Sequence, residues 1–114
     1  MARFAGRIHP FVRHELDAAR RAENRGEPDL AFRYLERAHV LGQSATLDHV
    51  GVHGRMLLWA LRHRKAGEAV GQLWRLVAAA LKTGLGWVPT GNTGGSNVSG
   101  LRRMPIPADL QCLL

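Results

Sequence analysis

Fifteen residues decide the fold, PDLAFRYLERAHVLG, which occupy positions 28–42. Pro28 suits the first turn of a helix, where a missing backbone N–H is harmless, and Asp29 lies favourably near the positive end of the helix dipole. Apolar side chains recur on one side at helical spacing: Ala31, Phe32, Leu35 and Ala38. Gly42 then ends the pattern. The stretch therefore predicts an amphipathic helix over residues 28–41.

The same two signals, an apolar stripe and a glycine that ends it, predict three further helices around this one. They are expected over residues 10–25, 45–65 and 68–83. The inner face of the last helix would hold Val70, Leu73, Trp74, Val77, Ala80 and Leu81. Helices joined by short turns favour antiparallel neighbours, and no stretch alternates as a strand does. We therefore predict an all-α fold, either a compact four-helix bundle or paired helical hairpins with tetratricopeptide-like packing.

The last thirty residues have a different composition, rich in glycine and proline. Residues 86–95 carry turn chemistry from end to end, and residues 104–107 are extended by their prolines. Several apolar residues make this tail too hydrophobic for a free linker: Trp87, Val88, Leu101, Met104, Ile106 and Leu110. We expect one domain over residues 1–114, in which a helical bundle (10–84) is wrapped by an extended tail (85–114) whose last three residues are loose.

The composition sets outer limits on function. A chain of 114 residues has room for one domain. Its single cysteine, Cys112, excludes an internal disulfide and a cysteine-rich metal cluster. No signal peptide and no membrane span are visible, so we expect a cytoplasmic protein without a membrane partner. The net charge of +7 comes from basic residues scattered over the helices, which argues against direct nucleic-acid binding.

Six histidines are the more informative count, because three of them fall where apolar residues belong. His49 and His53 are one helical turn apart, on the face assigned to the core. His39 lies on the apolar stripe of the preceding helix, three residues after Glu36, and Glu15 lies in the middle of the first helix's stripe. Burying any of these groups without a partner would cost a few kcal/mol. They therefore need one another, water or a cation.

A metal site is the first hypothesis for this cluster. A Glu-x-x-His pair on one helix facing a His-x-x-x-His pair on the next is a ligand arrangement used inside helical bundles. We expect a divalent transition metal (zinc, nickel, cobalt, iron or copper), because the donors are nitrogen and carboxylate without thiolate. The predicted ligands are His39, His49, His53 and Glu36, with Glu15 as a ligand or as an acceptor behind the ligands.

Two other hypotheses stay open. A lone histidine on an apolar face is more often hydrogen-bonded in the core than bound to metal, so the cluster can instead be a buried network inside a metal-free module that binds another protein or a second copy. A metal-dependent enzyme would need an open coordination position and a general base, for which Glu15 or Glu36 could serve. A zincin-type protease is excluded, because Val50 follows His49 where such a site needs glutamate. No catalytic residue is predicted.

At this point a family resemblance appears. Residues 31–43, followed by His49-x-x-x-His53 and Met56-Leu-x-Trp59, resemble a bacterial family catalogued as domain of unknown function 3703. The tail segments 89–98 and 104–110 are similar to that family as well. The resemblance implies a small cytosolic bacterial protein of unassigned function, and it associates such proteins with gene neighbourhoods for heavy-metal resistance.

Overall fold

The computed structural model describes residues 2–84 and 104–114, and it contains five helices in these two segments. They are α1 (Ala2–Asn24), α2 (Pro28–Gly42), α3 (Thr46–Arg62), α4 (Ala66–Gly84) and α5 (Ala108–Gln111). No strand occurs among these residues. The prediction of an all-α fold with four long helices is confirmed.

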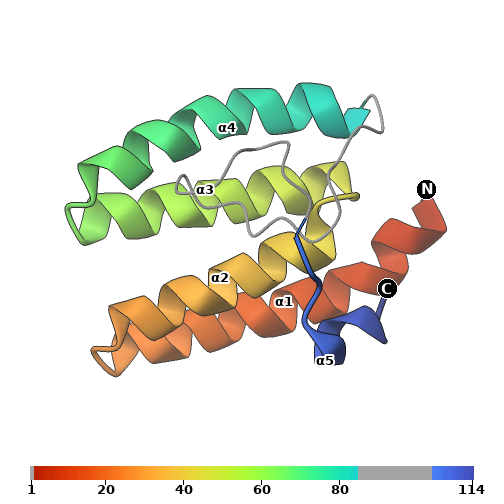
Figure 1. The fold of residues 1–114 in the computed structure, drawn as a ribbon, viewed down its shortest axis with the longest axis horizontal. Coiled ribbons are helices and arrows are strands. Elements are labelled where there is room, and N and C mark those ends of the chain that lie inside the picture. Colours follow the sequence, from red (N-terminus) through yellow and green to blue (C-terminus); the bar gives the residue numbers. More distant parts are fainter. Residues whose placement is uncertain (1, 85–103) are drawn as a thin grey trace.

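The helices are arranged as two antiparallel hairpins, α1 with α2 and α3 with α4 (Figure 1). The hairpins meet along α2 and α3, so α4 lies at one edge of the array and packs against α3 alone among the described elements. Gly26, with φ of +77°, closes the first hairpin in a backbone conformation that favours glycine. Of the two predicted arrangements, the structure has the paired hairpins.

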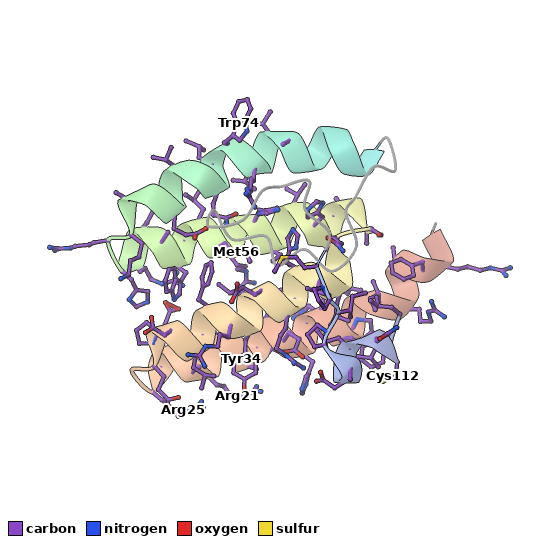
Figure 2. The ribbon with its side chains drawn as sticks, viewed as in Figure 1. Arg21, Arg25, Tyr34, Met56, Trp74 and Cys112 are labelled. Carbon is purple, nitrogen blue, oxygen red and sulfur yellow. The ribbon has the colours of Figure 1, made fainter. Side chains whose placement is uncertain are left out.

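The core lies within and between the two hairpins and under α5. Its largest fully buried apolar side chains are Ile8, Val12, Leu41, Val52, Met56 and Leu110. Figure 2 shows Met56 between α2 and α3. Alanines on the facing sides of α1 and α2 are also buried, which lets these two helices approach closely: Ala18, Ala19, Ala22, Ala31 and Ala38.

Trp59 is buried as well. Its Nε1 donates to the carbonyl of Pro28 at 2.9 Å, which ties α3 to the first turn of α2. Its ring lies 4.4 Å from that of Phe32, measured between ring centroids. These contacts fix one end of the α2–α3 interface.

The other end of that interface depends on Gly42. A Cβ added at this position would lie 3.1 Å from the Cβ of Asp48 and 3.2 Å from Cγ2 of Val12. The absence of a side chain therefore lets the end of α2 pack directly against the start of α3. This close approach brings the last turns of α2, which carry His39, next to the first turns of α3.

Two helix predictions are wrong in detail. α1 begins at Ala2, whereas the sequence predicts a helix that begins at residue 10, so Pro10 lies inside the helix and not in its first turn. Ile8, which is fully buried, explains the longer helix, because its burial offsets part of the cost of about 3 kcal/mol for an interior proline. The other difference concerns the orientation of α4.

The expected inner face of α4 points outward. Its residues are 60–74% exposed: Val70, Leu73, Trp74 and Val77. Figure 2 shows Trp74 pointing away from α3. The side turned toward α3 carries Gln72 instead, which is fully buried, and Ala69. The side chains of Ala80 and Leu81 lie outside the described part of the structure.

The described part of the tail packs on the first hairpin. Leu110 is 1% exposed, and Ile106 and Leu113 pack against the core at partial exposure. Leu113 and Leu114 also donate backbone hydrogen bonds to Leu110 and Gln111, so the last residues are not loose as predicted. The glycine-rich segment 86–95 lies outside the described residues. Within 2–84 and 104–114, no helix has the length and apolar character needed to cross a membrane.

Candidate metal centre

The three histidines predicted from the apolar stripes meet in the interior. His39 comes from the second half of α2, and His49 and His53 come from successive turns of α3. Their exposed fractions are 3%, 6% and 3%. The local reason is the spacing that the sequence shows: His49 and His53 share one helical face, and the contact at Gly42 holds that face against α2.

The Nε2 atoms of these rings form a nearly equilateral triangle. The distances are 3.0 Å between His39 and His49, 3.1 Å between His39 and His53, and 3.2 Å between His49 and His53. The ring centroids are farther apart, at 4.7–4.9 Å, and no pair of rings is stacked. Each ring therefore turns its Nε2 toward one common point.

These spacings fit a metal ion. Imidazole nitrogens bind zinc at about 2.05 Å, so two nitrogens on one ion are about 2.9 Å apart at an octahedral angle and about 3.3 Å apart at a tetrahedral one. The observed edges of 3.0–3.2 Å fall between these limits. Among the described residues, this is the group of donors that can hold a metal ion.

Hydrogen bonding alone accounts for the triangle less well. A neutral imidazole has one N–H and one lone pair, and a hydrogen bond is strong only when the N–H points along the acceptor's lone pair. Whatever the tautomers, at least one edge of the triangle places two lone pairs or two protons against each other. A cation at that point would accept all three lone pairs at once.

A side chain on α4 orients one of the rings. Gln72 Oε1 lies 2.5 Å from His53 Nδ1, and Gln72 Nε2 donates to Glu68 Oε2 at 2.6 Å. The carboxylate of Glu68 accepts, so it fixes which end of the amide faces His53, and His53 Nδ1–H must be the donor there. His53 is thereby held in the tautomer whose Nε2 carries a free lone pair, which is the form that binds metal.

Burial lowers the pKa of His53 below its usual value. The hydrogen bond to Gln72 opposes this effect, nearby Arg75 adds to it, and Glu68 opposes it. The pKa of Arg75 is itself lowered by burial. The net result is that His53 stays neutral at pH values where an exposed histidine is partly charged, as a metal ligand must.

This shift predicts that the metal-free protein loses stability in mild acid. The unfolded chain protonates His53 near pH 6.5, whereas the folded chain does so only at lower pH, so the free energy of unfolding falls as the pH drops below about 6.5. Urea unfolding with a chelator present should give a higher midpoint at pH 7.5 than at pH 5.5. The pKa values of Glu23 and Asp109 are also lowered. Protonation of these two carboxylates changes the free energy of unfolding only below about pH 4.5, outside the range compared here.

Two variants check that prediction. His53→Gln should show a smaller difference between the two pH values, and His14→Gln, which changes an exposed histidine, should behave as wild type. Equal midpoints at pH 7.5 and pH 5.5 in the wild type would contradict the assignment of a depressed pKa to His53.

The structure does not bring Glu15 to this cluster. Glu15 is buried, as its stripe position predicts, but it accepts two hydrogen bonds from Arg37, at 2.9 Å from Nη2 and 3.1 Å from Nε. Arg37 also contacts Asp109 of α5, at 2.5 Å from Nη2. Arg37 therefore links Glu15 of α1 to α2 and to the tail. Glu15 is not in the group of side chains that could hold a metal ion.

Glu36 is not in the group of described side chains that could hold a metal ion. It lines a cavity with Phe32 and Trp59, near the turn that connects α3 to α4, and it is half-buried. The group of side chains that could hold a metal ion thus contains three of the five predicted residues. Sequence reasoning missed Gln72, and the available signal was a polar residue inside the apolar run of residues 69–74.

The remaining described histidines lie elsewhere. His9 Nδ1 is 2.7 Å from Asp48 Oδ1, and His63 Nε2 is 2.9 Å from Glu23 Oε1. His14 is exposed. Among the described histidines, those of the cluster thus all lie on α2 and α3.

A family model described as "Protein of unknown function (DUF3703)" matches residues 6–114, which is nearly the whole chain and includes all three histidines and Gln72. This match confirms the resemblance found in the sequence. The chain matches none of the curated proteins and none of the solved structures compared with it.

Proposed function

The chain belongs to the DUF3703 family, whose function is unknown, and from this starting point we propose that it is a small cytosolic metal-binding accessory protein. In this proposal the Nε2 atoms of His39, His49 and His53 hold one divalent transition metal ion. The observation that carries it is the triangle of nitrogens with edges of 3.0–3.2 Å in a buried site.

The donor set favours a borderline metal. Three neutral imidazoles without thiolate or carboxylate suit zinc, cobalt, nickel, copper and iron better than calcium or magnesium, which take oxygen ligands. Three protein ligands are also typical of sites in which a further position is left for water or another ligand. An accessory role, in which a metal ion is held and passed on, uses such a position without any catalytic residue.

Cobalt(II) is the probe that tests this function. Chelator-treated, untagged protein is titrated with cobalt chloride at pH 7.5 while the visible absorption is recorded. We expect bands that saturate at one ion per chain and disappear when zinc is added. Absorption that rises without saturating, or that is equally strong in His49→Ala/His53→Ala, would contradict the proposal.

Gln72 provides a second prediction. Gln72→Leu removes the acceptor for His53 Nδ1–H, so the ring loses its fixed tautomer and orientation, and zinc affinity should fall about 10- to 100-fold. The measurement is competition with a chromophoric chelator. Glu68→Gln is the matched control, since it keeps an oxygen that accepts from Gln72 Nε2. Unchanged zinc affinity in Gln72→Leu would show that the hydrogen bond from His53 to Gln72 does not support metal binding by His53.

A second candidate function is the metal-free interaction module, which is favoured by the outer face of α4. Four apolar side chains at helical spacing are 60–74% exposed there: Val70, Leu73, Trp74 and Val77. Such a continuous apolar surface is typical of a contact with another protein. This candidate predicts no spectral change with cobalt and no effect of zinc on stability, so the same titrations distinguish the two functions.

A further inference from the structure

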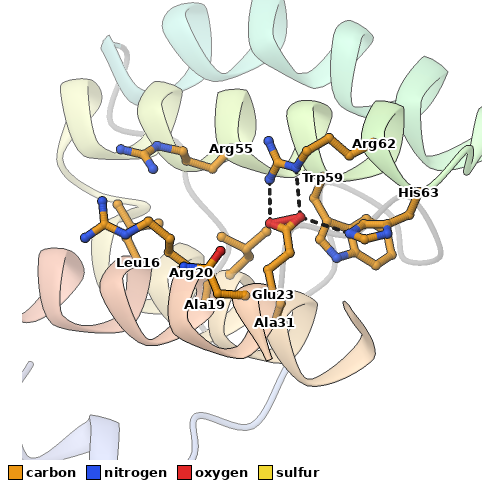
Figure 3. Close-up of a pocket in the computed structure, with 11 residues that line it drawn as sticks. Leu16, Ala19, Arg20, Glu23, Ala31, Arg55, Trp59, Arg62 and His63 are labelled. Atoms are coloured by element: carbon orange, nitrogen blue, oxygen red, sulfur yellow. Dashed lines mark hydrogen bonds and ion pairs between the residues drawn. The ribbon is translucent and has the colours of Figure 1, made fainter. Parts of the chain in front are cut away.

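A cavity of about 400 Å³ lies between the hairpins, where the second half of α1 and the start of α2 face the end of α3 (Figure 3). It shares no lining residue with the histidine triangle. Its volume is in the range of pockets that take small molecules. Its lining chemistry is distinct from that of the metal centre.

Positive charge dominates the walls of this cavity. Arg20 lines it from α1, and Arg55 and Arg62 line it from α3. Glu23 is the carboxylate among the lining residues. Figure 3 shows Arg55 and Arg20 on opposite walls, with Glu23 next to Arg62. Three guanidinium groups therefore face one carboxylate.

The single carboxylate is already occupied. Arg62 donates to both oxygens of Glu23, at 2.8 Å from Nε and 2.7 Å from Nη2, and His63 Nε2 lies 2.9 Å from Oε1. The hydrogen bond from Arg62 is the main reason that the pKa of Glu23 is lowered, so this carboxylate is ionised at neutral pH and neutralises one of the guanidinium groups.

The charges of Arg55 and Arg20 are not neutralised by Glu23. Arg55 makes no hydrogen bond or ion pair with any residue in the described ranges 2–84 and 104–114. Arg20 makes a single contact, with Asp17 at 3.3 Å, and its side chain is 66% exposed. An exposed pair of this kind contributes little stability, so a bound anion can replace or share it.

Apolar side chains complete the cavity. Leu16, Leu35 and Trp59 line it together with the arginines. A ligand that fits both parts of the lining carries an anionic group on an apolar body. Guanidinium groups bind carboxylate and phosphate through paired, charge-assisted hydrogen bonds.

We propose that this cavity binds a small organic anion, with its carboxylate or phosphate group between Arg20 and Arg55 and its apolar body against Trp59 and Leu35. The site is independent of the metal centre, because no residue is common to both. Arg55 contributes most of the recognition, since its guanidinium is the one that has no partner among the described residues.

The test uses phenyl phosphate, benzoate, inorganic phosphate and phenol as probes, with tryptophan fluorescence as the readout. A Trp74→Phe/Trp87→Phe background leaves Trp59, which lines the cavity, as the reporter. We expect saturable changes with phenyl phosphate or benzoate, and weaker binding of inorganic phosphate and phenol. Whichever of the two aryl anions binds more tightly identifies the anionic group that the site prefers.

Arg55→Gln should weaken the binding of the aryl anions about tenfold or more. Arg33→Gln is the matched control, because Arg33 is an exposed arginine on α2 outside the cavity. His49→Ala/His53→Ala should bind the anions as wild type does. If Arg55→Gln and Arg33→Gln weaken binding equally, the effect comes from the overall charge of the protein and the proposal is overturned. Phenol that binds as tightly as the anions would overturn it as well.

Discussion

Saturating zinc is expected to raise the melting temperature of the wild-type protein by about 10 °C and to leave that of His49→Ala/His53→Ala unchanged. A ligand that binds only the folded state at a hundred times its dissociation constant adds about 2.7 kcal/mol to the free energy of unfolding. For a domain of about one hundred residues, each kcal/mol corresponds to roughly 4 °C. The measurement is a calorimetric or circular-dichroism melt with and without zinc at pH 7.5.

His49→Ala/His53→Ala needs a control variant that also lacks two histidines. His9→Ala/His14→Ala removes two side chains outside the cluster, both exposed. It should show the full zinc-dependent shift. An equal shift in His49→Ala/His53→Ala and in this control would place the binding on surface histidines. Repeating the melts at pH 5.5 should give a smaller shift in the wild type, because protonated imidazole does not bind metal.

Arg37→Ala is expected to destabilise the protein by about 3 kcal/mol, whether or not metal is present. Arg37 makes the hydrogen-bonded ion pair with the buried Glu15, whose side chain is 7% exposed. Removing one partner of a buried pair costs about 3–5 kcal/mol because the other charge stays unpaired, and the lower end applies here since the Arg37 side chain is 30% exposed. Urea unfolding of the chelator-treated protein measures the effect.

A second pair of variants isolates the unpaired charge. Arg33→Ala, on the same helix and exposed, should change the free energy of unfolding by less than about 0.5 kcal/mol. Glu15→Leu/Arg37→Met, which removes both charges and keeps apolar volume, should be more stable than Arg37→Ala. If Arg37→Ala costs no more than Arg33→Ala, the pair with Glu15 does not hold α1, α2 and α5 together.

The helices and the histidine cluster could be predicted because both leave a periodic mark on the sequence. Three histidines at apolar-stripe positions of adjacent helices had to meet, and they do. Glu15 carried the same mark, but its partner Arg37 lies twenty-two positions away on a neighbouring helix, and periodicity does not indicate which buried polar groups pair. The apolar stripe therefore predicted correctly that Glu15 is buried. Which buried polar groups lie together can be seen only in the folded structure.

The orientation of α4 could not be predicted for a related reason. Hydrophobicity alone selects the stripe with Val70, Leu73, Trp74 and Val77, which is exposed in the structure. The helix instead turns Gln72 inward, where the hydrogen bond to His53 is available. The start of α1 was predicted wrongly for a similar reason. Proline prefers the first turn of a helix, but α1 continues past Pro10 toward the N-terminus, where Ile8 is buried.

The zinc content of untagged protein shows whether His39, His49 and His53 hold one metal ion. Wild type, His49→Ala/His53→Ala and His9→Ala/His14→Ala are dialysed against the same zinc-buffered solution at pH 7.5 and analysed for zinc and protein. We predict one zinc per chain in the wild type and in His9→Ala/His14→Ala, and none in His49→Ala/His53→Ala. Zinc absent from the wild type, or present equally in all three proteins, would contradict the claim.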